Sequence, residues 1–528
     1  MNSDYRSTLV ENEASEAAAG FPALSSEQAI ANLARAVDEI SATLGMSAVN
    51  ARVGGMEAND AVLYNGAPID TQVTVLPASV ADVQSLIRIA GRCECRLVFK
   101  SESTMTCGRS SSLASRPRIL VDLQRMNRVI AVDDVRACAI VEPGVSYFDL
   151  YEHLRAGSHD LMMTVPDEAS VSVVSHVLYR NSHRRWRGSD VAETCGLEVV
   201  LSSGEVVRTG DVLSHYVDPS NHLAPDDSFE AFFSRGDLGI VTKIAVRLAH
   251  RPRRQIACSV RCVDEKSLRP LLNITRRLMA DGVLSGDIVV TNLIATAARF
   301  SERTDWYKGN GPIPEPLLEK IIAETGLGRW EMRFTLAGSA SVVRARLDDA
   351  RNSYEGASGL HLTWHEYDGG APGDAVREID KIQAGIPPSF PTEQRQWYGA
   401  GSGQFEFTLA ALPLAERTIE SCKLIRSSLH EYRLDYHAQL QLLSGAIVQR
   451  CIVPFSVTIP GSQDWARAAV TATLELARAA GLIICRTDVE IPELMTCESS
   501  AALLGSLQKK VRLTIDPLRI FARERPGE

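Results

Sequence analysis

Apolar residues recur along this chain with two different spacings, which predicts a mixture of helices and strands. Helical spacing is clearest over residues 25–44, where every third or fourth position is apolar. A second helix is expected after Ser79, because Ser79 and Asp82 have the spacing of a capping box, in which each side chain bonds the other residue's free backbone N–H. Further helices are expected over residues 267–279, 315–325 and 464–480.

Short β-branched runs between these helices predict strands. A hairpin is clearest at residues 197–208, where Ser203 and Gly204 separate two apolar runs. Other strands are expected over residues 74–77, 96–99, 118–122, 137–141, 240–248 and 330–336. Strands and longer helices alternate from about residue 255 to 480, so the pattern as a whole predicts an α+β protein with a boundary near the basic run 251–254.

Composition excludes several classes of protein. Among 528 residues, 65 are Asp or Glu and 56 are Lys or Arg, and this acidic balance argues against nucleic acid as a partner. No apolar run of about 18 residues is present, so no membrane span is expected. The first 20 residues lack the pattern of a secretory signal, and the 11 cysteines are scattered without paired spacing. We therefore expect a cytoplasmic protein with reduced thiols.

Eight short segments occur in an order that is typical of one enzyme family. They lie at residues 126–129, 141–145, 165–167, 196–200, 239–243, 327–330, 385–387 and 516–520. With these segments the chain resembles the vanillyl-alcohol oxidase and 4-cresol dehydrogenase branch of FAD-linked oxidases, over roughly residues 60–525. The resemblance implies an α+β fold, in which a PCMH-type FAD-binding domain of two subdomains is combined with an α+β cap domain.

The resemblance also implies a domain order. Residues 1–60 would be a helical lead-in, 61–250 the FAD-binding domain, 251–484 the cap, and 485–528 a return to the FAD-binding domain. Members of the family oxidise para-substituted phenols: hydride passes from the benzylic carbon to the flavin, and a quinone methide forms. Several members form homodimers or larger assemblies, so we expect a homo-oligomer.

Two loops that hold the flavin diphosphate in the family have lost their glycines here. Glycine allows backbone N–H groups to turn toward a phosphate at little steric cost. The first loop, residues 103–111, keeps only Gly108, and the second, residues 168–176, has none. Val171 and Val173 in the second loop are β-branched, and such residues resist left-handed conformations.

Two interpretations of these losses stay open. In the first, FAD binds noncovalently, and the resemblance places a set of residues around it: Gly108, Arg109, Ser110, Ser111, Pro166, Ser170, Val171, Ser172, Gly239, Ile240 and Val241. In the second, flavin binding is lost and the scaffold serves another purpose. The histidine that attaches flavin in the vanillyl-alcohol oxidase branch is matched by Phe405, which cannot form that bond.

Three residues are candidates for chemistry in the cavity. Asp167 matches an aspartate that assists proton transfer near the flavin, although it could also cap the turn after Pro166. Arg486 matches an arginine that binds the substrate oxygen, and its alternative role is an ion pair with Asp488 or Glu490. Arg184, in the basic run 180–187, replaces a pocket tyrosine; this run could bind an anion, form a solvated loop, or contact a subunit.

His361 and His365 have the i, i+4 spacing of zinc ligands on a helix. Their segment alternates like a strand, however, and there the two residues would lie about 13 Å apart. We therefore expect no metal site.

Taken together, the sequence predicts a vanillyl-alcohol-oxidase-like protein that acts on a phenolic or related small aromatic or secondary metabolite. One alternative is a flavin-free enzyme that uses Asp167 as acid or base for isomerisation, cyclisation or dehydration. Another is a pseudoenzyme, a non-catalytic subunit that partners an active homologue.

Overall fold

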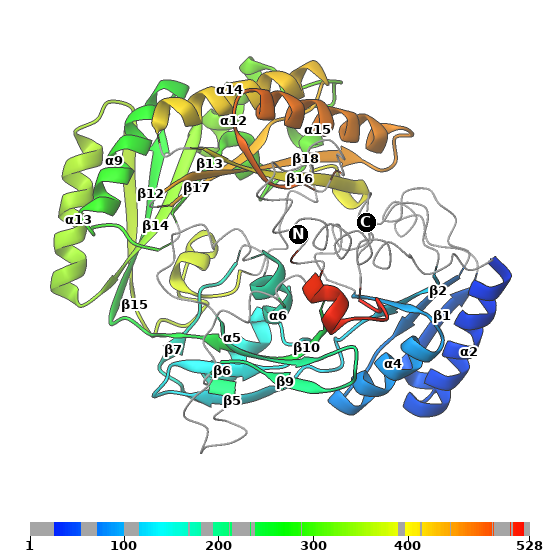
Figure 1. The fold of residues 1–528 in the computed structure, drawn as a ribbon. Helices are drawn as coiled ribbons and strands as arrows, with labels where there is room; N and C mark the ends of the chain where they lie inside the picture. Colours follow the sequence, from blue (N-terminus) through cyan, green and yellow to red (C-terminus); the bar gives the residue numbers. More distant parts are fainter. Residues whose placement is uncertain are drawn as a thin grey trace, which may run out of the picture.

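The fold was analysed in a computed structural model of the 528-residue chain. It has two lobes: an upper lobe formed by one large sheet with helices on its outside, and a lower lobe that contains two smaller sheets (Figure 1). The structure describes residues 26–53, 71–99, 116–166, 169–180, 194–210, 212–213, 233, 238–286, 288–388, 397–411, 414–443, 445–487, 489, 507 and 510–521.

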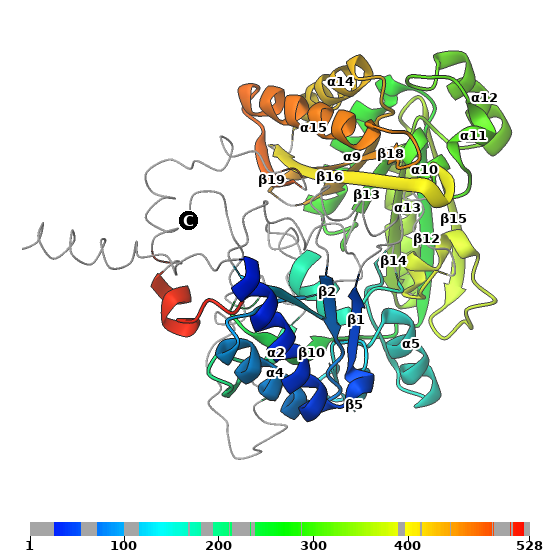
Figure 2. The ribbon, with the colours of Figure 1, turned by 90° about the vertical axis from the view of Figure 1, so that its right-hand side faces the viewer.

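The first sheet of the lower lobe has four strands in the order β1-β2-β4-β3. They are β1 (Val49–Val53), β2 (Thr71–Val75), β4 (Arg118–Val121) and β3 (Arg96–Phe99). Two helices, α2 (Ser26–Leu44) and α4 (Val80–Arg92), pack beside this sheet (Figure 2). Both helices were predicted from the sequence and are confirmed. α2 and β1 thus belong to the same layer as β2, β3 and β4.

The start of α4 shows the predicted cap with one change. Ser79 Oγ accepts from the backbone N–H of Asp82 at 3.1 Å, as a capping box requires. The Asp82 carboxylate accepts instead from the N–H of Ala78 at 2.9 Å. Near the C-terminus, Ile520 contacts this layer, since the N–H of Leu97 donates to the carbonyl of Ile520 at 2.9 Å.

The second sheet of the lower lobe is antiparallel and has the order β5-β6-β10-β8-β9. Its strands are β5 (Val129–Asp133), β6 (Cys138–Val141), β10 (Ile240–Arg247), β8 (Thr194–Val200) and β9 (Val206–Arg208). The predicted hairpin is confirmed as β8–β9. Three short helices lie against this sheet: α5 (Tyr147–Ala156), α6 (Val173–Ser175) and the π-helical turn η2 (His176–Arg180). A two-stranded ribbon joins β7 (Leu161–Met162) to β11 (Ala249–His250).

The upper lobe, which we call the cap, is one antiparallel sheet of eight strands. In spatial order they are β15 (Leu360–Asp368), β12 (Arg254–Cys262), β14 (Trp330–Gly338), β13 (Ile288–Asn292), β17 (His437–Leu442), β18 (Ile447–Ser456), β16 (Ser402–Ala411) and β19 (Ile483–Thr487). β19 continues this sheet to Thr487, three residues past the boundary expected at 484.

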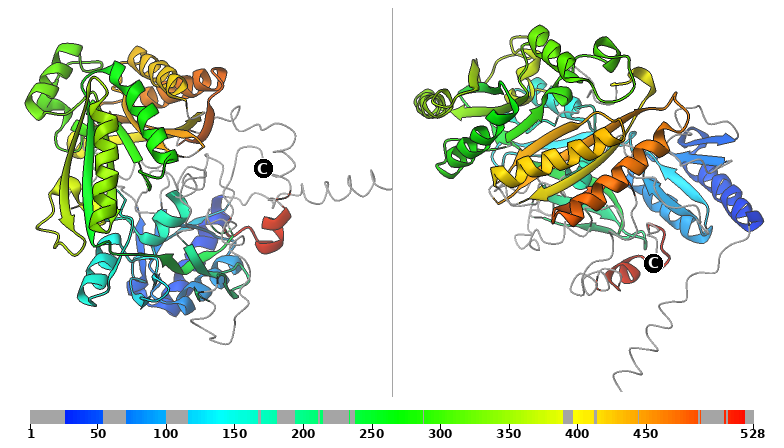
Figure 3. Two further views of the ribbon diagram at one scale, coloured as in Figure 1. Left: turned by 90° about the vertical axis from the view of Figure 1, so that its left-hand side faces the viewer. Right: turned by 90° about the horizontal axis from the view of Figure 1, so that it is seen from above.

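The long helices of the cap pack on the outer face of its sheet. Four of them lie there: α9 (Leu268–Ala280), α13 (Ala340–Glu355), α14 (Ala415–Glu431) and α15 (Ser462–Ala479). Seen from above, α14 and α15 lie side by side across the sheet (Figure 3). Smaller helices complete the lobe: α10 (Leu293–Ala297), α11 (Arg303–Trp306), α12 (Glu315–Thr325) and the 3-10 turns η4 (Glu265–Ser267), η5 (Glu378–Asp380), η6 (Ile382–Ala384) and η8 (Gly399–Gly401). The opposite, inner face is the side of the sheet turned toward the lower lobe (Figure 1).

His361 and His365 lie on β15, so the strand interpretation is confirmed. Within the described ranges no group of three or more His, Cys, Asp or Glu side chains could hold a metal ion. The nine cysteines that the structure describes are free thiols. No described helix is both long and apolar enough to cross a membrane.

Candidate functional site

The inner face of the cap sheet is polar where its outer face is apolar. On β16, Phe405, Phe407 and Leu409 belong to the large core beneath α14 and α15. The alternate residues Glu406 and Thr408 point to the inner face, because successive side chains of a strand take opposite sides. Over Gln404–Leu409, polar and apolar residues thus take opposite faces of this strand.

A cross-strand row on this half of the inner face contains a charged side chain. Thr408 on β16 is opposite Arg450 on β18, and Arg450 is opposite Gln439 on β17. Arg450 donates to the carboxylate of Glu406, which lies two residues from Thr408 on β16, at 2.7 Å and to the side-chain oxygen of Gln439 at 3.3 Å. The side chains of Glu406 and Arg450 are 13% and 29% exposed. They therefore form a half-buried ion pair on the side of the sheet that the outer helices do not cover.

The backbone of β19 adds a sequence-predicted residue to this row. The backbone of Arg486 pairs with that of Thr408, two strands from Arg450. Neighbouring strands are about 4.8 Å apart, which separates the two arginine backbones by about 10 Å. The side chain of Arg486 lies outside the described residues, as do Asp167 and Arg184. The structure thus places the backbone of Arg486 on the same cross-strand row as Arg450.

The opposite half of the inner face is covered by the cap's own chain. Arg333 donates to the backbone carbonyl of Ile379, and Thr335 donates to that of Gln383, at 3.0 and 2.9 Å. Arg333 also pairs with Glu331 and Asp380. Because η5 and η6 occupy this half, a ligand under the cap would meet the β16–β18 half, where Glu406 and Arg450 lie.

Phe405, the sequence match to the flavin-attaching histidine, does not point to the inner face of the cap sheet, the side that we call the chamber. Its side chain is 4% exposed and packs in the outer core against Phe455, with ring centroids 5.1 Å apart. The residues of β16 on the inner face are Ser402, Gln404, Glu406, Thr408 and Ala410. None of them is a histidine, tyrosine or cysteine, so the inner face of β16 holds no side chain of the nucleophilic type that forms a flavin bond. The amide oxygen of Gln404 is buried without a hydrogen-bond partner.

The second flavin loop is not strained by its valines. Val171 and Val173 are 2% and 0% exposed and pack into the core of the lower lobe. No residue from 169 to 175 has a positive φ. The expectation that β-branched residues would oppose left-handed conformations therefore does not apply to this loop, because its described part uses none.

Ser172 in this loop uses its hydroxyl within the protein. Its Oγ donates to the backbone carbonyl of Pro143 and accepts from the N–H of Ser175 at 3.2 Å. A serine has one hydroxyl proton, so Ser172 has none left to give a phosphate. Pro166 is buried, and Ser170 is exposed.

The loop can therefore meet FAD through backbone N–H groups and Ser170. Its described residues carry no Lys or Arg side chain. Gly108, Arg109, Ser110 and Ser111 of the first loop lie outside the described residues.

The next three residues that the family match placed near FAD, Gly239, Ile240 and Val241, have a structural role in the sheet of the lower lobe. A Cβ on Gly239 would lie 2.6 Å from the side chain of Val199, which is closer than real Cβ atoms approach other atoms. Ile240 and Val241 are 1% and 7% exposed. With their side chains in the interior, these three residues could meet a cofactor only through backbone atoms.

Sequence reasoning missed two buried polar pairs. The first is Glu406–Arg450, which the alternation of polar residues along 402–408 could have revealed. The second joins the hydroxyl of Tyr147 to Nδ1 of His176 at 2.7 Å, directly after the second flavin loop. No local sequence signal marks that pair, since 29 residues separate its members.

Comparisons with known proteins agree with this architecture. A family model described as an FAD-binding domain matches residues 71–210, a range that contains both flavin loops. The 4-cresol dehydrogenase flavoprotein subunit of Pseudomonas putida is 22% identical over 464 residues, covering 86% of this chain and 87% of that one. The 1'-carboxy-chondrochloren decarboxylase of Chondromyces crocatus is 27% identical over 267 residues, about half of each chain.

Solved structures share the whole fold. The 4-ethylphenol oxidase of Gulosibacter chungangensis superposes with a TM-score of 0.79 at 23% identity, covering 94% of this chain and 96% of that one. p-Cresol methylhydroxylase gives a TM-score of 0.75 at 20% identity, with the same coverage. The two-lobed α+β architecture expected from the sequence is confirmed: the chain has the fold of PCMH-type FAD-linked oxidases, and its residues 71–210 match an FAD-binding domain.

Proposed function

We propose that this protein is an FAD-linked oxidoreductase that binds FAD noncovalently and acts on a small phenolic or related aromatic metabolite under the cap. The observation that carries the proposal is the inner-face row in which Arg486 and Arg450 flank Thr408. Two arginines on one row suit an oxygen that carries negative charge, such as a phenolate. The named substrates of two relatives, 4-cresol and 4-ethylphenol, support this class.

Each residue has a role in this proposal. Arg486 binds the phenolate oxygen, and Arg450, held by Glu406 and Gln439, sets the charge beside it. Asp167 takes up the proton that the substrate releases. The flavin, when bound, supplies the acceptor for the hydride. We expect noncovalent attachment because Phe405, the sequence match to the flavin-attaching histidine, cannot form that bond and packs in the outer core.

Flavin content tests the proposal directly. We expect the purified protein to be yellow or to take up added FAD, and to release the flavin into the supernatant when it is precipitated with acid. Flavin that stays with the precipitate would contradict noncovalent binding. A colourless protein that gives no heat of binding with FAD in calorimetry would reject the oxidoreductase altogether.

A flavin-free function is the second candidate, and the internal use of the Ser172 hydroxyl favours it. Under this alternative the chamber carries out acid–base chemistry with Asp167, or the chain stabilises an active homologue. If the protein is colourless, loss of product formation in Asp167→Asn supports the enzyme. Co-purification with a glycine-complete homologue, without activity alone, supports the subunit.

A further inference from the structure

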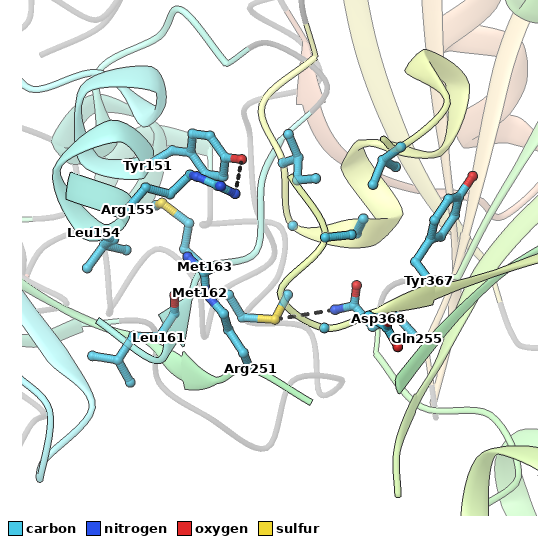
Figure 4. A pocket seen from close by; sticks show the side chains of 16 residues that line it. Tyr151, Leu154, Arg155, Leu161, Met162, Met163, Arg251, Gln255, Tyr367 and Asp368 are labelled. Atoms are coloured by element: carbon cyan, nitrogen blue, oxygen red, sulfur yellow. Dashed lines mark hydrogen bonds between the residues drawn. The ribbon is translucent and has the colours of Figure 1, made fainter. Parts of the chain in front are cut away.

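The junction between the two lobes is packed too closely to hold a second ligand. Tyr151 and Arg155 of α5 lie across from Tyr367 of β15, with Met162 between these two walls (Figure 4). The hollow that remains has a volume of about 20 Å³, which is room for about one water molecule. A partner other than the substrate of the chamber would therefore bind at the outer surface of the described residues.

An apolar stripe runs along the outward face of α15. Its two large residues, Trp465 and Leu476, are 52% and 45% exposed. Ala468 and Ala479 are exposed as well, and Ala472 is partly exposed. The five residues follow one another at steps of three or four, which brings them to one face of a helix with 3.6 residues per turn. Seen from above, no described helix or strand lies over α15 (Figure 3).

Trp465 is held in a fixed orientation on this stripe. Its Nε1 donates to the carbonyl of Tyr432 at 2.7 Å, and the two rings have centroids 5.4 Å apart. A side chain that is already ordered loses little entropy on binding, and aromatic anchors of this kind contribute much of the binding energy at protein interfaces. The alanines beside it are small, so a second helix can approach α15 closely.

Charged residues along one flank of the stripe form a pattern that is its own complement. Asp464 in the first turn and Arg478 in the last turn are each seven residues from Thr471. Arg467 and Glu475 are each four residues from Thr471. At about 100° per residue, all four charged residues lie on the same flank of the helix.

This spacing matches a second α15 that runs antiparallel to the first, with the two Thr471 residues opposite each other. Asp464 then faces Arg478 of the partner subunit, and Glu475 faces Arg467 of the partner subunit. A two-fold axis uses the same patch on both copies, so a self-complementary patch is what such an interface requires. The order of charges on α15 therefore favours a second copy of this chain over an unrelated partner.

We propose that the outward face of α15 binds a second copy of this chain through a two-fold, antiparallel helix pair. Trp465 inserts between Leu476 and Ala479 of the partner subunit, and the charged pairs line one flank. Ile459 and Ile483, which are exposed just before and just after α15, add apolar area at both ends of the pair. This proposal does not depend on whether FAD is bound.

Sedimentation equilibrium of the full chain at several concentrations tests the proposal. One helix per copy is a small interface, and interfaces below about 1,200 Å² are typical of weak association, so we expect a reversible dimer with a micromolar Kd. Ala472→Glu should abolish it, because two glutamates would face each other beside the axis. Ala345→Glu, at an exposed position of α13, should leave it unchanged. A monomer at every concentration up to about 1 mM, or a dimer that Ala472→Glu does not weaken, would overturn the proposal.

Charge reversal tests the antiparallel pairing itself. Arg478→Glu should weaken the dimer about tenfold, because attraction becomes repulsion at both ends of the helix pair, and Asp464→Arg should do the same. The two changes in one chain exchange the signs and should restore the original affinity. Arg417→Glu on α14, at a position 63% exposed, should leave the affinity unchanged. A double variant that associates no better than the single ones would reject this arrangement.

Cysteine cross-linking gives an independent measurement. Ala472→Cys places one thiol of each copy beside the axis, within the range of a disulfide when two helices approach to about 8 Å. Oxidation with diamide should convert this variant into a covalent dimer on a non-reducing gel. Ala345→Cys on α13 measures the yield from chance collisions. Equal yields from the two variants would contradict the interface.

Discussion

Arg450 donates to Glu406 at 2.7 Å across the β16–β18 pair, on the face of the cap sheet that looks toward the FAD-type lobe. The same sheet pairs Thr408 with Arg486 one strand further on. The ion pair therefore determines the charge near Arg486, the residue that we propose binds the substrate oxygen. It is half-buried, so its loss should change binding more than an exposed pair would.

Arg450→Gln should weaken substrate binding. The change leaves the Glu406 carboxylate, 13% exposed, without its charged partner and adds net negative charge beside the phenolate. We expect KM to rise about tenfold and stability to fall by about 1–3 kcal/mol, less than for a fully buried pair. Steady-state kinetics and denaturant unfolding measure the two effects.

Arg426→Gln is the matched control. Arg426 pairs with Glu265 at 3.0 Å on the outer side of the cap, where the Glu265 side chain is 45% exposed against 13% for Glu406. Its loss should change stability by no more than about 1 kcal/mol and leave KM unchanged. Equal KM in both variants and the unmodified protein would contradict a role for Arg450 in the chamber.

Phe405→Ala should destabilise the cap without affecting FAD uptake. Truncating a buried phenylalanine costs about 3–5 kcal/mol, and Phe405 packs in the outer core with Phe455. Gln404→Ala, its neighbour on the inner face, should have a much smaller effect on stability. Denaturant unfolding and FAD titration check both, and reduced FAD uptake in a folded Phe405→Ala protein would show that this residue does reach the cofactor.

The sequence predicted helices, strands and turns better than it predicted contacts between side chains. Local patterns sufficed for α2, for the start of α4 at Ser79 and for the β8–β9 hairpin, because caps, periodicity and turns are local properties. The family match aligned Phe405 with a flavin-attaching residue, yet a shift of one residue along a strand reverses the face of the sheet. That reversal separates Phe405 in the core from Glu406 in the chamber.

Contacts between distant segments could not be foreseen. Ser172 was expected to hold the flavin, but its hydroxyl donates to Pro143, 29 residues earlier in the chain. The glycine loss in this loop looked like a source of strain, and only the backbone angles show that residues 169–175 avoid left-handed conformations. Both facts depend on how α6 is packed, which no local pattern encodes.

Ser172→Ala should reduce stability and leave FAD affinity unchanged. The hydroxyl caps α6 through Ser175 and bonds Pro143, so its removal should cost about 1–2 kcal/mol. No proton of that hydroxyl is available to a phosphate. Denaturant unfolding and FAD titration measure the two effects, with exposed Ser170→Ala as the control that should not change stability. Loss of FAD affinity in Ser172→Ala alone would show that its hydroxyl contacts the cofactor after all.

His437 should make the cap sensitive to mild acid. The residue is 1% exposed, and neither ring nitrogen has a hydrogen-bond partner among the described residues. Burial lowers its pKa to about 4, Asp435 opposes this shift, and Arg303 adds to it. The unfolded chain binds a proton at this residue below about pH 6.5, whereas the folded protein does so only near pH 4, so stability is lost as pH falls between these values.

His437→Phe removes this titration while it keeps a ring beside Trp397, whose ring centroid lies 5.2 Å away. Between pH 7 and pH 5 the unmodified protein should lose about 2 kcal/mol more stability than the variant. Denaturant unfolding at the two pH values gives this difference directly. If both proteins lost the same amount of stability, His437 would be charged in the folded state. Its ring would then need a hydrogen-bond acceptor in addition to the charge of Asp435.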